Sequence, residues 1–156
     1  MPAEPSGEVR QALYASTRLH WSAVQVYTAI AAWYAPQYPN LSKRFSDEAF
    51  DEQGHLKLLL DRLRYFGDTS VFEAGPSIPF AEGFEAVLRF LLQMEEGASE
   101  AEQQGIDAAR NASDEQTARV FTELQQGSQA SVLQLEADLQ TIEDIGLDNY
   151  LAAFVG

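Results

Sequence analysis

Apolar residues recur every three or four positions along most of this 156-residue chain. That spacing is the period of an α-helix with one buried face. It predicts four long helices and a short fifth one, over about 8–34, 41–66, 81–111, 113–145 and 147–154. Asn40 and Ser113 are the expected N-caps of the second and fourth helices, and Ser113 also begins a capping-box pattern. No strand, Rossmann or phosphate-loop pattern occurs, so the predicted fold class is all-α.

The connections between the predicted helices differ in length. Two are short, whereas 68–79 contains Gly, Pro, Ser and Thr without any helical period. A four-helix bundle with a long crossover between the second and third helices has this arrangement. We therefore expect one domain over 1–156, in which 1–7 is a tail, 8–145 forms the bundle and 147–154 is a closing helix.

The charge balance narrows the classes of partner. Ten basic and 24 acidic residues give a net charge of −14, which repels nucleic acid and anionic membranes and attracts cations. The absence of cysteine excludes disulfides and thiolate chemistry. The N-terminus carries no signal pattern, and no apolar run approaches the roughly 18 residues of a membrane span. We expect a cytoplasmic protein that binds neither nucleic acid nor membranes.

Polar residues interrupt the apolar stripes of three predicted helices. Glu52 and His55 are three residues apart, so both side chains point from one face of the second helix. His20 and Glu95 fall on the inward faces of the first and third helices at a similar height. A buried carboxylate is costly unless it is paired, hydrogen-bonded or bound to a metal ion. These four residues are the predicted metal ligands, and a metal-free hydrogen-bonded network is the alternative.

Three segments resemble bacterioferritins and ferritins. They are His20–Tyr27, which is similar to the first-helix segment of that family, Phe50–His55, which matches its second-helix Glu-x-x-His, and Gly146–Leu151, which is similar to the tail of bacterioferritins. The length, helix order and long crossover extend the resemblance over nearly the whole chain. It implies a ferritin-like four-helix bundle with a short fifth helix.

The resemblance also implies a di-iron ligand set, which this chain holds incompletely. Glu52, His55 and Glu95 match family ligands, and His20 stands where the first-helix glutamate belongs. Ser128 and Ser131 occupy the positions of the second Glu-x-x-His, while Gln129 lies one position away and is a further candidate ligand. Gln53 replaces the methionine that binds haem in bacterioferritins, so no haem is expected.

Four ligands, two of them imidazoles, suit one Fe(II) or Zn(II) ion better than two iron ions. The resemblance implies iron (Fe²⁺/Fe³⁺) storage or oxidation in a homo-oligomer, most simply a 24-subunit shell, with any ferroxidase activity weakened. The alternatives are a ferritin-like cage or dimer that keeps one structural metal, and a metal-free helical interaction module. The side chains expected to be partly exposed in a single bundle, and therefore to mark a subunit interface, are Trp21, Trp33, Tyr34, Tyr150, Leu151 and Phe154.

Overall fold

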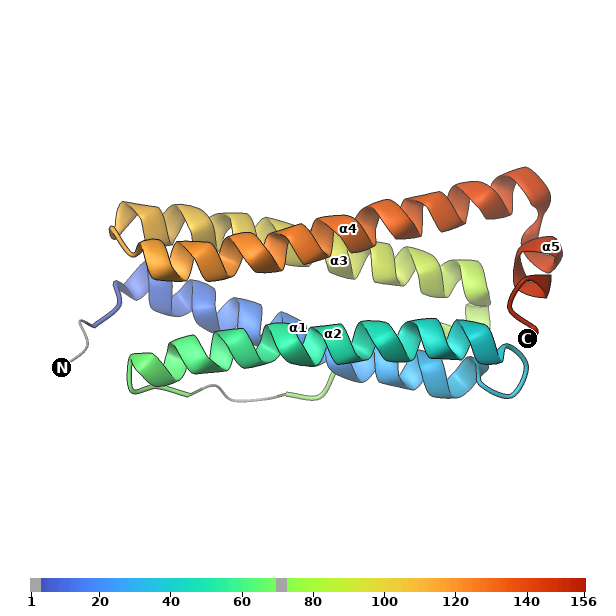
Figure 1. Cartoon of the computed structure of the whole chain (residues 1–156), viewed down its shortest axis with the longest axis horizontal. Coiled ribbons are helices and arrows are strands. Elements are labelled where there is room, and N and C mark those ends of the chain that lie inside the picture. Colours follow the sequence, from blue (N-terminus) through green and yellow to red (C-terminus); the bar gives the residue numbers. More distant parts are fainter. Residues whose placement is uncertain (1–3, 70–72) are drawn as a thin grey trace.

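The computed structural model describes residues 4–69 and 73–156 as a bundle of long helices closed at one end by a short one (Figure 1). The elements in chain order are α1 (Gly7–Tyr34), α2 (Pro39–Tyr65), the 3₁₀ turn η1 (Phe80–Glu82), α3 (Phe84–Asn111), α4 (Glu115–Ile145) and α5 (Leu147–Ala152). No strand occurs within the described ranges, so the all-α prediction is confirmed.

The four long helices form two antiparallel pairs. α1 packs along α2 and α3 packs along α4, and contacts between α1 and α3 join the pairs. α2 and α4 make few contacts with each other. The long connection after α2 returns the chain to the opposite end of the bundle, where α3 begins (Figure 1). This is the predicted crossover.

Several helix ends differ from the predicted boundaries, and the local chemistry of the residues there explains each difference. α2 begins at Pro39, which suits the first turn because it lacks an N–H, so Asn40 lies inside the helix and does not cap it. Ser113 has a φ of 57° and forms the turn, whereas the Asp114 side chain accepts from the Thr117 N–H and caps α4. Gly83, at a φ of 95°, separates η1 from α3 and delays the predicted start of that helix.

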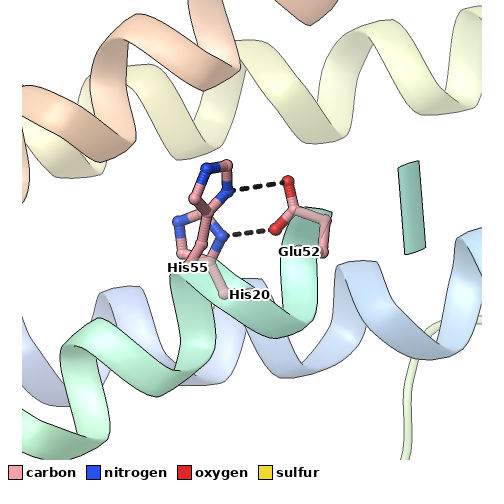
Figure 2. Close-up of side chains that lie close together, drawn as sticks. All are labelled: His20, Glu52 and His55. Atoms are coloured by element: carbon pink, nitrogen blue, oxygen red, sulfur yellow. Dashed lines mark hydrogen bonds and ion pairs between the residues drawn. The ribbon is translucent and has the colours of Figure 1, made fainter. Parts of the chain in front are cut away.

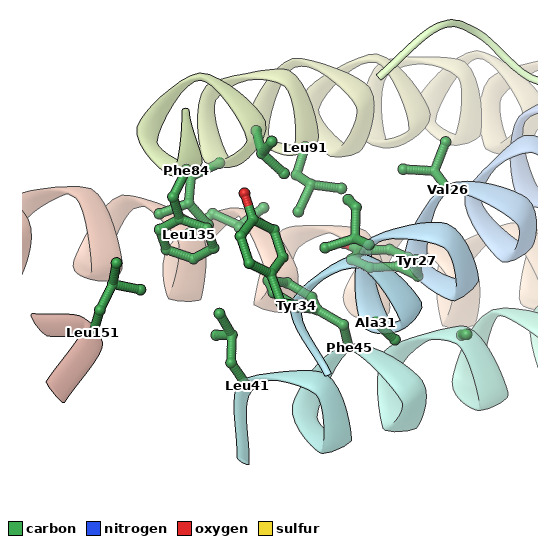
Figure 3. Packing of buried hydrophobic residues seen from close by; sticks show 14 of the residues in the cluster. Val26, Tyr27, Ala31, Tyr34, Leu41, Phe45, Phe84, Leu91, Leu135 and Leu151 are labelled. Atoms are coloured by element: carbon green, nitrogen blue, oxygen red, sulfur yellow. The ribbon is translucent and has the colours of Figure 1, made fainter. Parts of the chain in front are cut away.

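Two hydrophobic clusters fill the bundle and leave its middle polar. The larger one packs around Phe45, Phe84 and Leu91 toward the α5 end (Figure 3), and the smaller one packs around Leu13 and Phe121 at the other end. The buried polar side chains along the four helices between these clusters are Ser16, Thr17, His20, Glu52, Glu95, Glu102 and Ser128. The fold therefore places carboxylates and an imidazole where a continuous apolar core would otherwise lie.

The tail helix is fixed to the bundle by buried polar contacts. Asp138 accepts hydrogen bonds from Arg44 and from the Tyr150 hydroxyl, the latter at 3.0 Å. Tyr150, Leu151 and Tyr34 are buried within a single subunit, so their predicted exposure was wrong. Trp33 is 60% exposed, as expected, and its ring stacks on Phe80 at a centroid distance of 4.5 Å.

Among the described residues, no helix has both the length and the apolar character that crossing a membrane requires.

Candidate metal centre

A group of three potential ligands, two of them buried and one half-buried, lies between the two hydrophobic clusters. His20 comes from α1, and Glu52 and His55 come from α2, one helical turn apart (Figure 2). One ligand atom from each residue lies within 4.8 Å of those of the other two. The sequence-predicted inward faces of α1 and α2 thus meet at one point.

The carboxylate of Glu52 lies between the two imidazoles. Its Oε2 is 2.5 Å from Nδ1 of His20, and its Oε1 is 3.4 Å from Nδ1 of His55. Burial disfavours ionisation of Glu52, but its contacts with His20 and His55 outweigh that effect and lower the pKa of Glu52 to about 2. Glu52 is therefore an anion at neutral pH, as a metal ligand must be.

His20 is held from both sides of its ring. Nε2 lies 2.6 Å from Oε1 of Glu102, opposite the contact between Nδ1 and Glu52. Burial alone would lower the pKa of His20, yet the hydrogen bonds to Glu102 and Glu52 raise it to about 10. Without a metal ion, His20 is a cation between two carboxylates.

Glu102 was not among the predicted ligands, although α3 carried the signal. Leu91, Glu95, Ala98 and Glu102 follow one another at helical spacing, and Glu102 is completely buried. Glu102 Oε1 also accepts from the Ser128 hydroxyl at 3.4 Å, whereas its Oε2 is buried with no hydrogen-bond partner among the described residues. The apolar stripe of α3 thus contains two carboxylates, of which the sequence analysis identified one.

Glu95 is buried but lies outside the three-residue group. Its Oε1 accepts a 2.6 Å hydrogen bond from the Tyr27 hydroxyl of α1. Burial and the negative charge of Glu52 raise the pKa of Glu95 to about 8. Glu95 is therefore mostly a neutral acid at pH 7 in this arrangement.

The fourth helix brings no charged ligand to the centre. Ser128 is buried and donates to Glu102, and Ser131 is half-buried beside His55 in a surface cleft. Gln129 is exposed and lines a different cleft with residues of α3, including Glu96 and Ser99. In this geometry the Gln129 side chain is directed away from the group of His20, Glu52 and His55.

A cleft of about 450 Å³ between α2 and α4 reaches the centre from the surface. Glu52 and His55 line it, and Glu48 and Asp51 add carboxylates nearer its mouth. Gly127 of α4 makes room for the His55 ring, because a Cβ there would lie 2.8 Å from Cε1 of His55. The sparse packing between α2 and α4 thus leaves a cleft lined by carboxylates, through which a cation can reach the ligands.

The donor set fits one transition-metal ion. Two imidazoles and one carboxylate with open positions are a ligand set for non-haem Fe(II), and zinc accepts the same donors. Nδ1 of His55 is buried and makes no hydrogen bond of normal length within the described part of the chain, and Oε1 of Glu52 faces it at 3.4 Å. The Glu52 carboxylate beside this nitrogen raises the pKa of His55.

Comparison with protein-family models agrees with the fold. A comparison with curated proteins returned no match. The family model of the ferritin-like domain matches residues 10–145, which include all four long helices apart from the first turn of α1. The chain belongs to the ferritin-like family.

Proposed function

We propose that this protein binds a single iron ion per subunit through His20, Glu52 and His55. The observation that carries the proposal is the convergence of their three ligand atoms within 4.8 Å across two helices, where His20 and Glu52 are buried and His55 is half-buried. Isolated helices often carry Glu-x-x-His by chance, but they do not bring a second imidazole from a neighbouring helix. The net charge of −14 favours accumulation of cations at the protein surface.

The proposed stoichiometry follows from the charges at the centre. Two iron ions at close range repel each other strongly unless bridging carboxylates compensate them. Glu52 is the one carboxylate within the ligand group, and Ser128 and Ser131 on α4 are neutral. Oxidation of Fe(II) by dioxygen is accordingly slow, since no second iron stands ready to supply an electron.

We further propose that subunits assemble into a homo-oligomeric shell that stores iron, as the family resemblance implies. Trp33, which is exposed and stacks on the half-buried Phe80, is a candidate contact between subunits, since large exposed apolar groups commonly mark interfaces. A light-scattering mass of one or two subunits at micromolar concentration would exclude the shell. It would leave the single-ion site untouched.

Metal analysis tests the central proposal. Protein purified without chelator, or titrated anaerobically with Fe(II), should hold one ion per subunit. His55→Ala should abolish that binding because it removes one of the three ligands. The variant should still fold, since the side chain of His55 is not needed to fill the core. Glu123→Gln, on the exposed face of α4, is the matched control and should bind normally. No bound metal, or two tightly bound ions per subunit, would contradict the proposal.

A metal-free network is the second candidate, and one specific contact favours it. Both ring nitrogens of His20 already face carboxylates, at 2.5 and 2.6 Å, so the imidazole is satisfied without a metal ion. Buried polar networks of this kind rigidify a core when every member has a partner. Under this alternative, protein that has been exposed to Fe(II) and Zn(II) should contain neither ion.

A further inference from the structure

We propose that Glu102 is a positioning residue for the metal centre: it accepts the Nε2–H of His20 and so presents Nδ1 of His20 to the metal ion. This inference rests on the proposed function and specifies how α3 takes part in it. It also gives a role to the fully buried carboxylate that the sequence analysis overlooked.

The geometry separates the two sides of the His20 ring. Nε2 faces Glu102 Oε1 at 2.6 Å, whereas Nδ1 faces Glu52 Oε2 at 2.5 Å. The His55 ring lies on the Glu52 side as well, through its Nδ1 contact with Oε1 of Glu52 (Figure 2). The group of three ligands therefore uses Nδ1 of His20, and Glu102 occupies the nitrogen that the metal does not need.

A metal-binding histidine must be neutral, with its proton on the ring nitrogen opposite the metal ion. A carboxylate that accepts this proton fixes both the tautomer and the ring orientation, and it makes the metal-binding nitrogen more basic. Glu102 has that relation to His20. If Nδ1 and Glu52 held an ion, Nδ1 would have to release its proton to solvent, and Nε2 would keep the proton that it donates to Glu102.

The neighbours of Glu102 keep it in this role. The Ser128 hydroxyl donates to the same Oε1 that accepts from His20, so α4 contributes to the centre through Glu102 and not as a ligand. The other carboxylate of α3, Glu95, is engaged by Tyr27. Glu102 is thus the acidic group of α3 that contacts His20 in this structure.

Zinc binding by the full-length protein tests the proposal. Competition with a chromophoric chelator should give one Zn(II) per subunit for Glu102→Gln and Glu102→Ala, as for the unmodified protein. The affinity should fall about 10- to 100-fold, and Ala should lose more than Gln, because the glutamine carbonyl still accepts from Nε2–H. Equal affinities in all three proteins would overturn the positioning role.

Histidine side-chain ¹⁵N spectra of the zinc-loaded, unmodified protein provide a second readout that does not depend on how well the variants fold. Nδ1 of His20 should carry the zinc ion and Nε2 should carry a proton. Zinc on Nε2 would overturn the inference while leaving a metal site in place. Absence of zinc binding by the unmodified protein would instead overturn the proposed function, and the positioning role with it.

Asp138→Asn is the matched control. Asp138 is also a buried, hydrogen-bonded carboxylate, but it contacts Arg44 and Tyr150 near the tail helix. Its amide variant should lower the stability of the fold and leave zinc affinity unchanged. A comparable loss of zinc affinity in this variant would mean that Glu102 acts through general stability, which contradicts the proposal.

Discussion

The hydroxyl of Tyr27 donates a 2.6 Å hydrogen bond to Oε1 of Glu95, which joins α1 to α3 beside the candidate metal centre. Burial and the nearby Glu52 charge raise the pKa of Glu95 to about 8, and burial also raises that of Tyr27. The pair is thus neutral at pH 7, in contrast to the charged His20–Glu52 pair next to it. These adjacent pairs respond to pH in different ranges.

The metal-free protein should be most stable near pH 4.5 and should lose stability as pH moves in either direction. Glu52 has a lowered pKa, so its stabilising contribution is lost as pH falls from 4.5 toward 2. His20 has a raised pKa, so its contribution is lost as pH rises from 6.5 toward 10. The cost of ionising buried Glu95 grows from pH 4.5 to 8, which adds to the decline on the alkaline side. Urea unfolding in EDTA across this range measures the profile.

Glu95→Gln separates the two alkaline contributions. The amide keeps an acceptor for Tyr27 but does not titrate, so the loss of unfolding free energy between pH 6.5 and 8 should be shallower than in the unmodified protein. An unchanged slope would assign the whole decline to His20. A profile that rises steadily from pH 6.5 to 9 would contradict both assignments.

Helical periodicity predicted the long helices and which faces point inward, because burial of an apolar stripe requires only local spacing. His20, Glu52 and Glu95 are buried for that reason. The pairing of these groups was not predictable in the same way. Whether Glu95 meets Tyr27 or His20 depends on the rotation and axial offset of α3 against α1, which periodicity leaves free. Glu102 was missed on the same stripe, seven residues beyond Glu95.

The exposure of aromatic residues shows a second limit of sequence reasoning. Tyr34 and Tyr150 were expected to be partly exposed in a single bundle and therefore to lie at a subunit interface. In the structure, Tyr150 is buried through its contacts with Asp138 and Arg44. Asp138 and Arg44 lie 12 and 106 positions from Tyr150 in the sequence. The burial of Tyr150 therefore depends on how α5 packs against the bundle, which no local sequence pattern reveals.

Gly127→Ala should weaken metal binding without unfolding the protein. The added Cβ would lie 2.8 Å from Cε1 and 3.2 Å from Nε2 of His55, so the partly exposed ring must leave its present position beside Glu52. Alanine favours the helix by about 1 kcal/mol over glycine, which offsets the local strain. We expect Zn(II) affinity to fall about tenfold, or roughly 1.4 kcal/mol, by chelator competition.

Gly54→Ala is the control for that variant. Gly54 lines the same cleft from α2, but a Cβ there meets nothing within 4 Å. This variant should bind Zn(II) as tightly as the unmodified protein. If Gly127→Ala bound zinc equally tightly, the His55 ring would have no need of the space beside Gly127.

Two glycines of α3 should respond oppositely to substitution by alanine. A Cβ at Gly105 would lie 2.7 Å from three atoms of the fully buried Phe121 ring, which has no free space to enter. Gly105→Ala should therefore destabilise the fold by about 1–3 kcal/mol. Gly97→Ala meets no atom within 4 Å and should stabilise it by about 0.5–1 kcal/mol. Chemical denaturation of both variants checks the contrast, and a shift in the same direction for both would contradict it.

Restoring the fourth-helix ligand pair should convert the single-ion site into one for two ions. Ser128→Glu places a carboxylate where the hydroxyl now faces Glu102 at 3.4 Å, and Ser131→His adds an imidazole at the cleft beside His55. Without metal, the new carboxylate is buried against Glu102, so the double variant should be less stable than the unmodified protein. Bound cations relieve that repulsion, so added Fe(II) or Zn(II) should raise its unfolding temperature more than that of the unmodified protein.

We expect the double variant to bind two Fe(II) per subunit and to show faster aerobic oxidation in stopped-flow absorbance, whereas the unmodified protein should show one ion and slow oxidation. A fast phase that consumes two Fe(II) per subunit in the unmodified protein would show that α4 already supplies the missing charge.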